Sequence, residues 1–242
     1  MKPRTPPTPL RRFDLLRLAG IAAGCLLLAD AASAETVQRR DGLDPLTAAQ
    51  LDFRVGGVQC TRESGATMLI PWDRVRAIDD IEDPSLREAW AIQQPIAEQL
   101  WRARARVQRG DARLAEPLFE LHFDRMMSDL EDSELRLIVA EGLLRVRLAR
   151  GAIEEALPAA LETIRLRRAG LTTDRYQSLP DIIDERFWLI PALPPITTDQ
   201  VQTQRLPERL RPWVDSEDPF VRALASGYAS RSGTPRLSLI HI

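Results

Sequence analysis

The chain has 242 residues, of which 44% are hydrophobic and 28% are charged, and its formal net charge is −2. These values are ordinary for a soluble globular protein of one or two domains. The first 34 residues hold five basic and two acidic side chains, so the rest of the chain has 28 basic and 33 acidic residues and a net charge of −5. This acidic balance disfavours nucleic-acid binding, which needs a concentrated basic surface.

Residues 1–34 have the three parts of a secretory signal peptide. Basic residues precede an apolar run at 18–29, and small residues follow at 32–34. The run is too short for a stable membrane span. A lipobox-like stretch at 22–25 and a twin-arginine-like motif at 11–16 are alternative export signals. An ordinary cleaved signal is favoured because the chain stays apolar after Cys25. The mature protein is therefore expected in a bacterial periplasm or outside the cell.

Cleavage would leave Cys60 as the single cysteine of the mature chain. One cysteine makes neither an internal disulfide nor a cysteine metal cluster. Cys60 belongs to an apolar, strand-like run and is expected to be a buried thiol. No cofactor or metal site is predicted.

Residues 35–81 are expected to form a small β-rich module. Residues 51–55 alternate apolar and polar, Gly56-Gly57 permits a sharp turn, and 58–61 resume the alternation. A further strand is expected at 67–70. Three or four short strands predict a small twisted sheet of the SH3- or Sm-like barrel type.

Capping residues and helix breakers divide residues 82–170 into helices. Asp83 is an N-cap before Pro84, and Pro95 is expected to end or kink that helix so that a second begins there. The remaining predicted boundaries are N-caps at Asp111 and Ser133 and terminating glycines at Gly110, Gly151 and Gly170.

One helix-turn-helix pattern occurs twice within residues 82–170. Three residues recur at the same offset of 41: Gly110 and Gly151, Ala115 and Ala156, Pro117 and Pro158. A fixed offset between helix pairs is typical of a helical repeat array. The pattern Gly110-Asp111-x-x-x-Ala115-x-x-x-Phe119 resembles the turn and second helix of a tetratricopeptide repeat (TPR), in which small residues let two helices approach and Phe119 would fill the next gap. The period exceeds the usual value of about 34.

The resemblance implies a mainly α fold of TPR-like helical hairpins, α+β overall once the β-rich module is included. The order of signal, β module and repeats also resembles exported proteins of planctomycete-like bacteria whose function is not established. It therefore implies no particular activity.

The C-terminal third of the chain changes character. Residues 171–213 are proline-rich and are expected to pack over the repeats, with a short helix near Asp181 to Leu189. Asp218-Pro219 predicts another helix within 214–236, the start of a partial further repeat. Residues 237–242 resemble a translated transposase mosaic end from a sequencing library, so His241 is excluded from functional reasoning.

Three features have both a functional and a structural interpretation. His122 is a possible general base, but a hydrogen-bonded core imidazole is favoured because no catalytic partner is placed beside it. Trp72 is a possible contact residue of the β module, with a core position favoured. The third feature is an acidic run, Asp79, Asp80, Glu82 and Asp83. A solvated turn is favoured for it, and the alternative is that its carboxylates are catalytic.

The sequence has no GxSxG, HExxH, CxxC, P-loop or dinucleotide-binding pattern, and no catalytic residue is assigned. The expected function is that of an exported, non-catalytic scaffold whose concave helical surface binds a protein or peptide. The alternative is an accessory N-terminal region of a truncated enzyme or envelope protein whose catalytic domain lies beyond Arg236.

Overall fold

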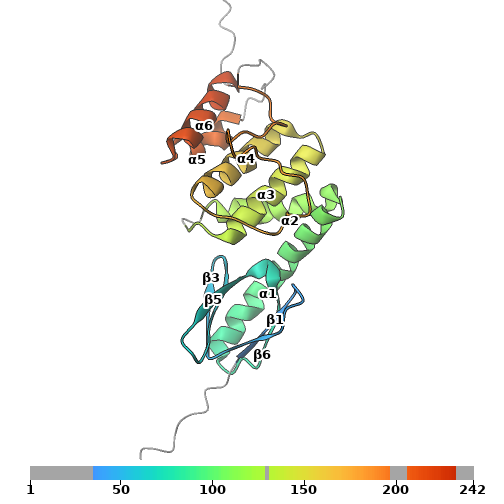
Figure 1. The fold of residues 1–242 in the computed structure, drawn as a ribbon, viewed down its shortest axis with the longest axis vertical. Helices are drawn as coiled ribbons and strands as arrows, with labels where there is room; N and C mark the ends of the chain where they lie inside the picture. Colours follow the sequence, from blue (N-terminus) through green and yellow to red (C-terminus); the bar gives the residue numbers. More distant parts are fainter. Residues whose placement is uncertain (1–34, 129–130, 197–205, 233–242) are drawn as a thin grey trace, which may run out of the picture. The chain divides into compact units, whose positions relative to one another are not determined.

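The computed structural model describes residues 35–128, 131–196 and 206–232. The predicted signal peptide and the 237–242 segment lie outside this part of the chain. The described residues contain six α-helices and two three-stranded antiparallel sheets, a mixed α+β fold (Figure 1). None of the helices described is both long enough and apolar enough to span a membrane.

Six short strands form the β-rich part, where three or four were expected. One sheet has the order β2-β1-β6, and the other has the order β3-β4-β5. The strands are β1 (Glu35–Arg39), β2 (Leu46–Ala48), β3 (Gln50–Arg54), β4 (Gly57–Thr61), β5 (Thr67–Pro71) and β6 (Val75–Asp79). At the β3–β4 turn, a Cβ on Gly57 would lie 2.2 Å from the carbonyl oxygen of Ile70. Glycine is therefore required there for the close approach of β5.

Trp72 is a core residue of the β-rich part, as favoured from the sequence. Its side chain is 1% exposed, and its indole N–H donates to the carbonyl oxygens of Arg54 and Val55, both at 3.1 Å. It also stacks on Trp90 of helix α1 (Pro84–Gln108), with ring centroids 6.2 Å apart. Cys60 is buried as expected, and burial raises the pKa of its thiol to about 11.

Helix α1 begins where it was predicted, but the expected break at Pro95 is wrong. Asp83 caps the helix by accepting a hydrogen bond from the backbone N–H of Ser85 at 2.8 Å. The helix then continues through Pro95 to Gln108. Pro95 is exposed, while Trp90 and Leu100 on either side of it are buried. Burial of these flanking residues offsets the lost backbone hydrogen bond, which costs about 3 kcal/mol.

Two hairpins of the same local geometry follow: α1 with α2 (Ala112–Met126), and α3 (Glu134–Ala149) with α4 (Ile153–Arg168). Gly110 and Gly151 have φ angles of 81° and 71° in the two turns. Arg106 and Arg147 each donate from Nη1, at 2.8 Å, to a carbonyl oxygen in the next helix, those of Leu114 and Glu155. These pairs also differ by 41 in number, so the predicted offset extends to side-chain contacts.

The predicted caps of α2 and α3 differ in outcome. The Ser133 hydroxyl accepts from the backbone N–H of Arg136 at 3.2 Å and caps α3 as predicted. Asp111 stands at the N-cap of α2, but its side chain makes no capping hydrogen bond and instead pairs with Arg109. The tight turn places the two side chains beside each other, and ion pairing takes the place of capping.

Close packing of α3 on α2 depends on Gly142. A Cβ on this residue would lie 2.4 Å from the Phe119 ring and 2.6 Å from the Tyr176 hydroxyl. Phe119 is fully buried and fills the gap between the helices, as the sequence suggested.

The prediction of a short helix near Asp181–Leu189 is wrong. This segment consists of turns closed by a bridge between Asp184 and Leu189. Residues 171–196 are held by side chains instead: the Tyr176 hydroxyl donates to the Ile138 carbonyl at 2.8 Å, and Arg175 pairs with buried Asp73 at 2.9 Å. Within the segment, the Asp184 carboxylate accepts a hydrogen bond from the backbone N–H of Arg186 at 3.0 Å, and this local turn competes with a helix.

Two further helices pack on α4: α5 (Leu206–Val214) and α6 (Pro219–Ser232). The start of α6 was predicted correctly, since Asp218 accepts from the backbone N–H of Phe220 at 2.8 Å. Helix α5 was not predicted, because Pro207 and Pro212 suggested a helix-free connection. Pro207 occupies the second position, where its missing N–H costs no helical hydrogen bond.

Candidate functional site

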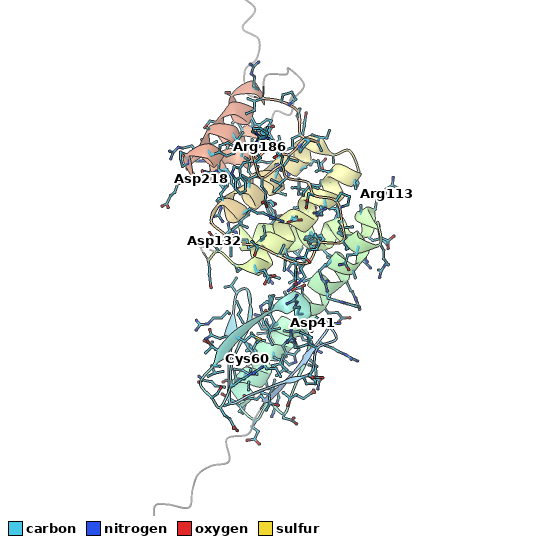
Figure 2. The ribbon with its side chains drawn as sticks, in the orientation of Figure 1. Asp41, Cys60, Arg113, Asp132, Arg186 and Asp218 are labelled. Carbon is cyan, nitrogen blue, oxygen red and sulfur yellow. The ribbon has the colours of Figure 1, made fainter. Side chains whose placement is uncertain are left out.

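A groove of about 950 Å³ lies where α2, α4 and α5 meet. Each helix contributes side chains to the lining of the groove, for example Phe123 of α2, Pro158 of α4 and Trp213 of α5. Figure 2 draws the side chains as sticks and labels Asp132 and Asp218. These two residues line a neighbouring hollow of about 690 Å³. The two hollows share Met127, Pro212 and Trp213 and thus form one extended surface feature.

The floor of the groove is apolar and tightly packed. Phe123 is 6% exposed and Trp213 is 2% exposed. Their rings stack at 6.4 Å between centroids with an interplanar angle of 18°. Pro158 is buried and Met127 is half-buried beside them. These side chains pack against one another, and Met127 is the most accessible of the four.

Behind the floor, a buried ion-pair cluster fixes the position of Trp213. Glu162 accepts hydrogen bonds from Arg136 at 2.6 Å, from Arg165 at 2.8 Å and from the Trp213 indole N–H at 2.8 Å. Arg165 also bonds Asp132. Burial alone would raise the pKa of Glu162, but the hydrogen bond and charge of Arg165, together with the charge of Arg136, hold it below its usual range.

Charged side chains of both signs line the groove. Its acidic lining residues are Glu120, Asp124, Glu154 and Glu155. The lining also includes two guanidinium groups, those of Arg147 and Arg209. Arg147 is 3% exposed and is engaged by Glu120 at 2.6 Å and Glu116 at 3.4 Å. Glu155 is paired in the same way with Arg150 at 3.2 Å, and Arg209 is exposed. At least two of the four carboxylates are therefore ion-paired within the protein.

His122 lies outside this groove. It is 1% exposed, and its Nε2 is 3.1 Å from Oε1 of Gln99 on α1. Burial, with a smaller contribution from Arg125, lowers the pKa of His122 to about 4. The imidazole is neutral at pH 7 and packs between α1 and α2, which agrees with the structural interpretation.

The four carboxylates of the acidic run are exposed: Asp79 ends β6, and Asp80, Glu82 and Asp83 lie between β6 and α1. Asp79 accepts a hydrogen bond from Gln38 at 3.0 Å, and Asp83 caps α1. Asp80 has a φ angle of 61°, consistent with a tight turn. In the part of the chain described, no group of three or more His, Cys, Asp or Glu residues is arranged to hold a metal ion.

Sequence reasoning did not find the groove, because one of its walls belongs to the unpredicted helix α5. The available signal was the spacing of Leu206, Leu210 and Trp213, which places three apolar residues on one helical face. The chain matched no protein-family model, no curated protein and no solved structure.

Proposed function

We propose that this chain is an exported, non-catalytic scaffold for protein–protein interaction. In this proposal α1–α4 are TPR-like repeats, the α5–α6 pair is a further hairpin of the array, and the β-rich part is an SH3- or Sm-like module. A bound peptide would not have to displace contacts between α2 and α5, because the groove is already open and has a volume of about 950 Å³. The function is supported most by this preformed groove, whose apolar floor is held rigid by the Glu162 cluster.

Partner capture with a groove variant tests this function. Ile153 is 37% exposed and lines the groove, whereas Ile92 on α1 is 62% exposed and does not line it. Ile153→Arg and Ile92→Arg introduce the same side chain at these two positions. We expect a discrete partner from an envelope extract to bind the native chain and Ile92→Arg but not Ile153→Arg. Equal capture by all three chains, or capture by none, would overturn the proposal.

Export is tested separately by fusing residues 1–34 to alkaline phosphatase that lacks its own signal. The fusion should be active only after export from the cytoplasm, and Leu27→Arg, within the apolar run, should abolish the activity. Cys25→Ser distinguishes the lipoprotein route, and Arg11→Lys with Arg12→Lys distinguishes the twin-arginine route. Retained activity in both sets supports an ordinary cleaved signal. An inactive native fusion would contradict export.

A further inference from the structure

One face of helix α2 is apolar and open to solvent. Leu114 and Leu121 are 58% and 60% exposed. Pro117, which is exposed, and Leu118, which is half-buried, lie between them on the same face, since the four residues are spaced i, i+3, i+4 and i+7. These four residues are called the α2 stripe. A helix normally buries such a stripe against another element, so the stripe is a candidate contact surface.

The equivalent face of α4 is covered by another helix. Pro158 corresponds to Pro117 at the offset of 41 and is buried. Glu162 corresponds to Leu121 and is also buried, and it accepts a hydrogen bond from the indole N–H of Trp213 on α5 at 2.8 Å. The same face of the second helix in each hairpin is therefore covered in α4 and is open and more apolar in α2.

Two charged residues flank the α2 stripe. Arg113 precedes it and Asp124 follows it; both are exposed, and neither makes an ion pair within the described ranges of the chain. Their separation of 11 residues is close to three helical turns, so both lie on one side of the stripe. The midpoint of this pair nearly coincides with the midpoint of Leu114 and Leu121. The face thus has opposite charges at its two ends, on the same side.

We infer that two copies of this chain associate by packing their α2 stripes against each other, antiparallel, about a two-fold axis. Such an isologous contact exchanges the two ends of the helix, so each residue meets one at the same distance on the other side of the axis. Leu114 would pack on Leu121 of the second copy, and Arg113 would lie beside Asp124 of the second copy. Symmetry repeats both contacts, and the antiparallel order also brings opposite ends of the two helix dipoles together.

A second copy matches these charges better than a partner of uniform charge, which would meet a like charge at one end of the stripe. Arg125, which is also exposed, falls near Asp111 of the second copy. Asp111 already pairs with Arg109 at 3.5 Å, so this contact adds little. Arg113 and Asp124 therefore provide the main charge complementarity.

The contact is small, because each copy contributes one helix face. Stable interfaces bury about 1,200–2,000 Å² in total, and smaller ones are weak. We therefore expect a reversible dimer that dissociates on dilution. In the dissociated chain the exposed Leu121 contributes little to the free energy of unfolding.

Sedimentation velocity of the intact chain over a dilution series tests the dimer. The mass should rise from one copy to two as the concentration increases. Leu121→Glu should weaken dimerisation by at least about 10-fold, because an unpaired carboxylate would be buried in the contact. The matched control is Leu43→Glu, at a leucine of the β-rich part that is 58% exposed, and it should leave dimerisation unchanged.

Exchange of charges tests the antiparallel order. Arg113→Asp and Asp124→Arg each replace two attractions by two repulsions and should weaken the dimer by about 3- to 10-fold. The double variant, in which the two charges are exchanged, should restore dimerisation. An equimolar mixture of the two single variants should also restore it, because a mixed dimer has opposite charges at both contacts.

Three results would overturn the inference: a single copy at every concentration, a dimer unaffected by Leu121→Glu or by the single charge variants, or a weakened dimer that the double variant does not restore. Leu121 does not line the groove, so Leu121→Glu should still capture the partner that Ile153→Arg loses. Failure of self-association therefore leaves the scaffold function standing, and failure of partner capture leaves the dimer standing.

Discussion

The hairpins α1–α2 and α3–α4 have the same turn but different surroundings. In each turn the glycine has a positive φ angle, and an arginine in the preceding helix, Arg106 or Arg147, bonds a carbonyl oxygen of the following helix at 2.8 Å. Yet α3 is buried along most of its length, whereas α1 exposes Ile92. Turn geometry follows from a few local residues, while burial depends on which other segments pack against the helix.

The difference is clearest at positions related by the offset of 41. Gly142 is enclosed by Phe119 and Tyr176, whereas Trp101 in α1 is half-buried and lies under the guanidinium of Arg40. Buried charge likewise occurs in the second hairpin, where neighbouring helices provide ion-pair partners. The following substitutions test how far equivalent positions have diverged.

The largest effect is expected at Glu162. Glu162→Ala would remove the 2.6 Å partner of buried Arg136, whose pair with Asp132 is longer at 3.9 Å, and the acceptor of the Trp213 indole. Breaking a buried ion pair on one side costs about 3–5 kcal/mol of unfolding free energy. The equivalent residue of the first hairpin, Leu121, is 60% exposed, and Leu121→Ala should change stability by less than about 0.5 kcal/mol. Urea unfolding of the two variants measures both; similar losses would show that Glu162 has no special structural role.

A smaller loss is expected from Gly142→Ala. Helix propensity alone would make alanine more stable by about 1 kcal/mol. The new Cβ, however, would meet the Phe119 ring at 2.4 Å, and overpacking of a core costs about 1–3 kcal/mol. Unfolding should therefore show net destabilisation, partly relieved in the double variant with Phe119→Leu. A more stable Gly142→Ala protein would contradict the close approach of α2 and α3.

The smallest effect at neutral pH concerns His122. Its pKa is lowered from 6.5 to about 4 in the folded chain, so the unfolded chain binds more protons between these values. Stability should therefore fall as pH decreases from about 6.5 to about 4, by at most about 1.4 kcal/mol per pH unit. His122→Gln should flatten this part of the stability curve. Thr163 stands at the equivalent position and has no titrating group in this range. An unchanged curve in His122→Gln would refute a neutral buried imidazole.

Local features of the fold were predictable from the sequence. Ser133 and Asp218 cap helices, and Gly110 and Gly151 form turns, because these residues act within a few positions of themselves. The strands from 51 to 70 followed from alternation of apolar and polar residues. The continuation of α1 through Pro95 was not predictable in this way, because burial of Trp90 and Leu100 by other segments of the chain outweighs the local helix breaker.

Long-range features were not predictable in this way. Val37 pairs with Ile78, 41 residues away along the chain, and nothing in either strand specifies that partner. The groove depends on Phe123, Pro158 and Trp213, which come from three helices. One of these helices, α5, contains two prolines, which argued against a helix at the level of sequence. A site of this kind is defined by packing of helices against one another and becomes visible only in three dimensions.

Site-specific photo-crosslinking tests the central claim, that a partner occupies the groove, most directly. Benzoylphenylalanine would replace either Ile153, which lines the groove, or Ile92, which does not, in the intact chain within cells. If a partner occupies the groove, position 153 should give a discrete crosslinked adduct and position 92 should give none. The same adduct from both positions, or an adduct from position 92 alone, would contradict the claim.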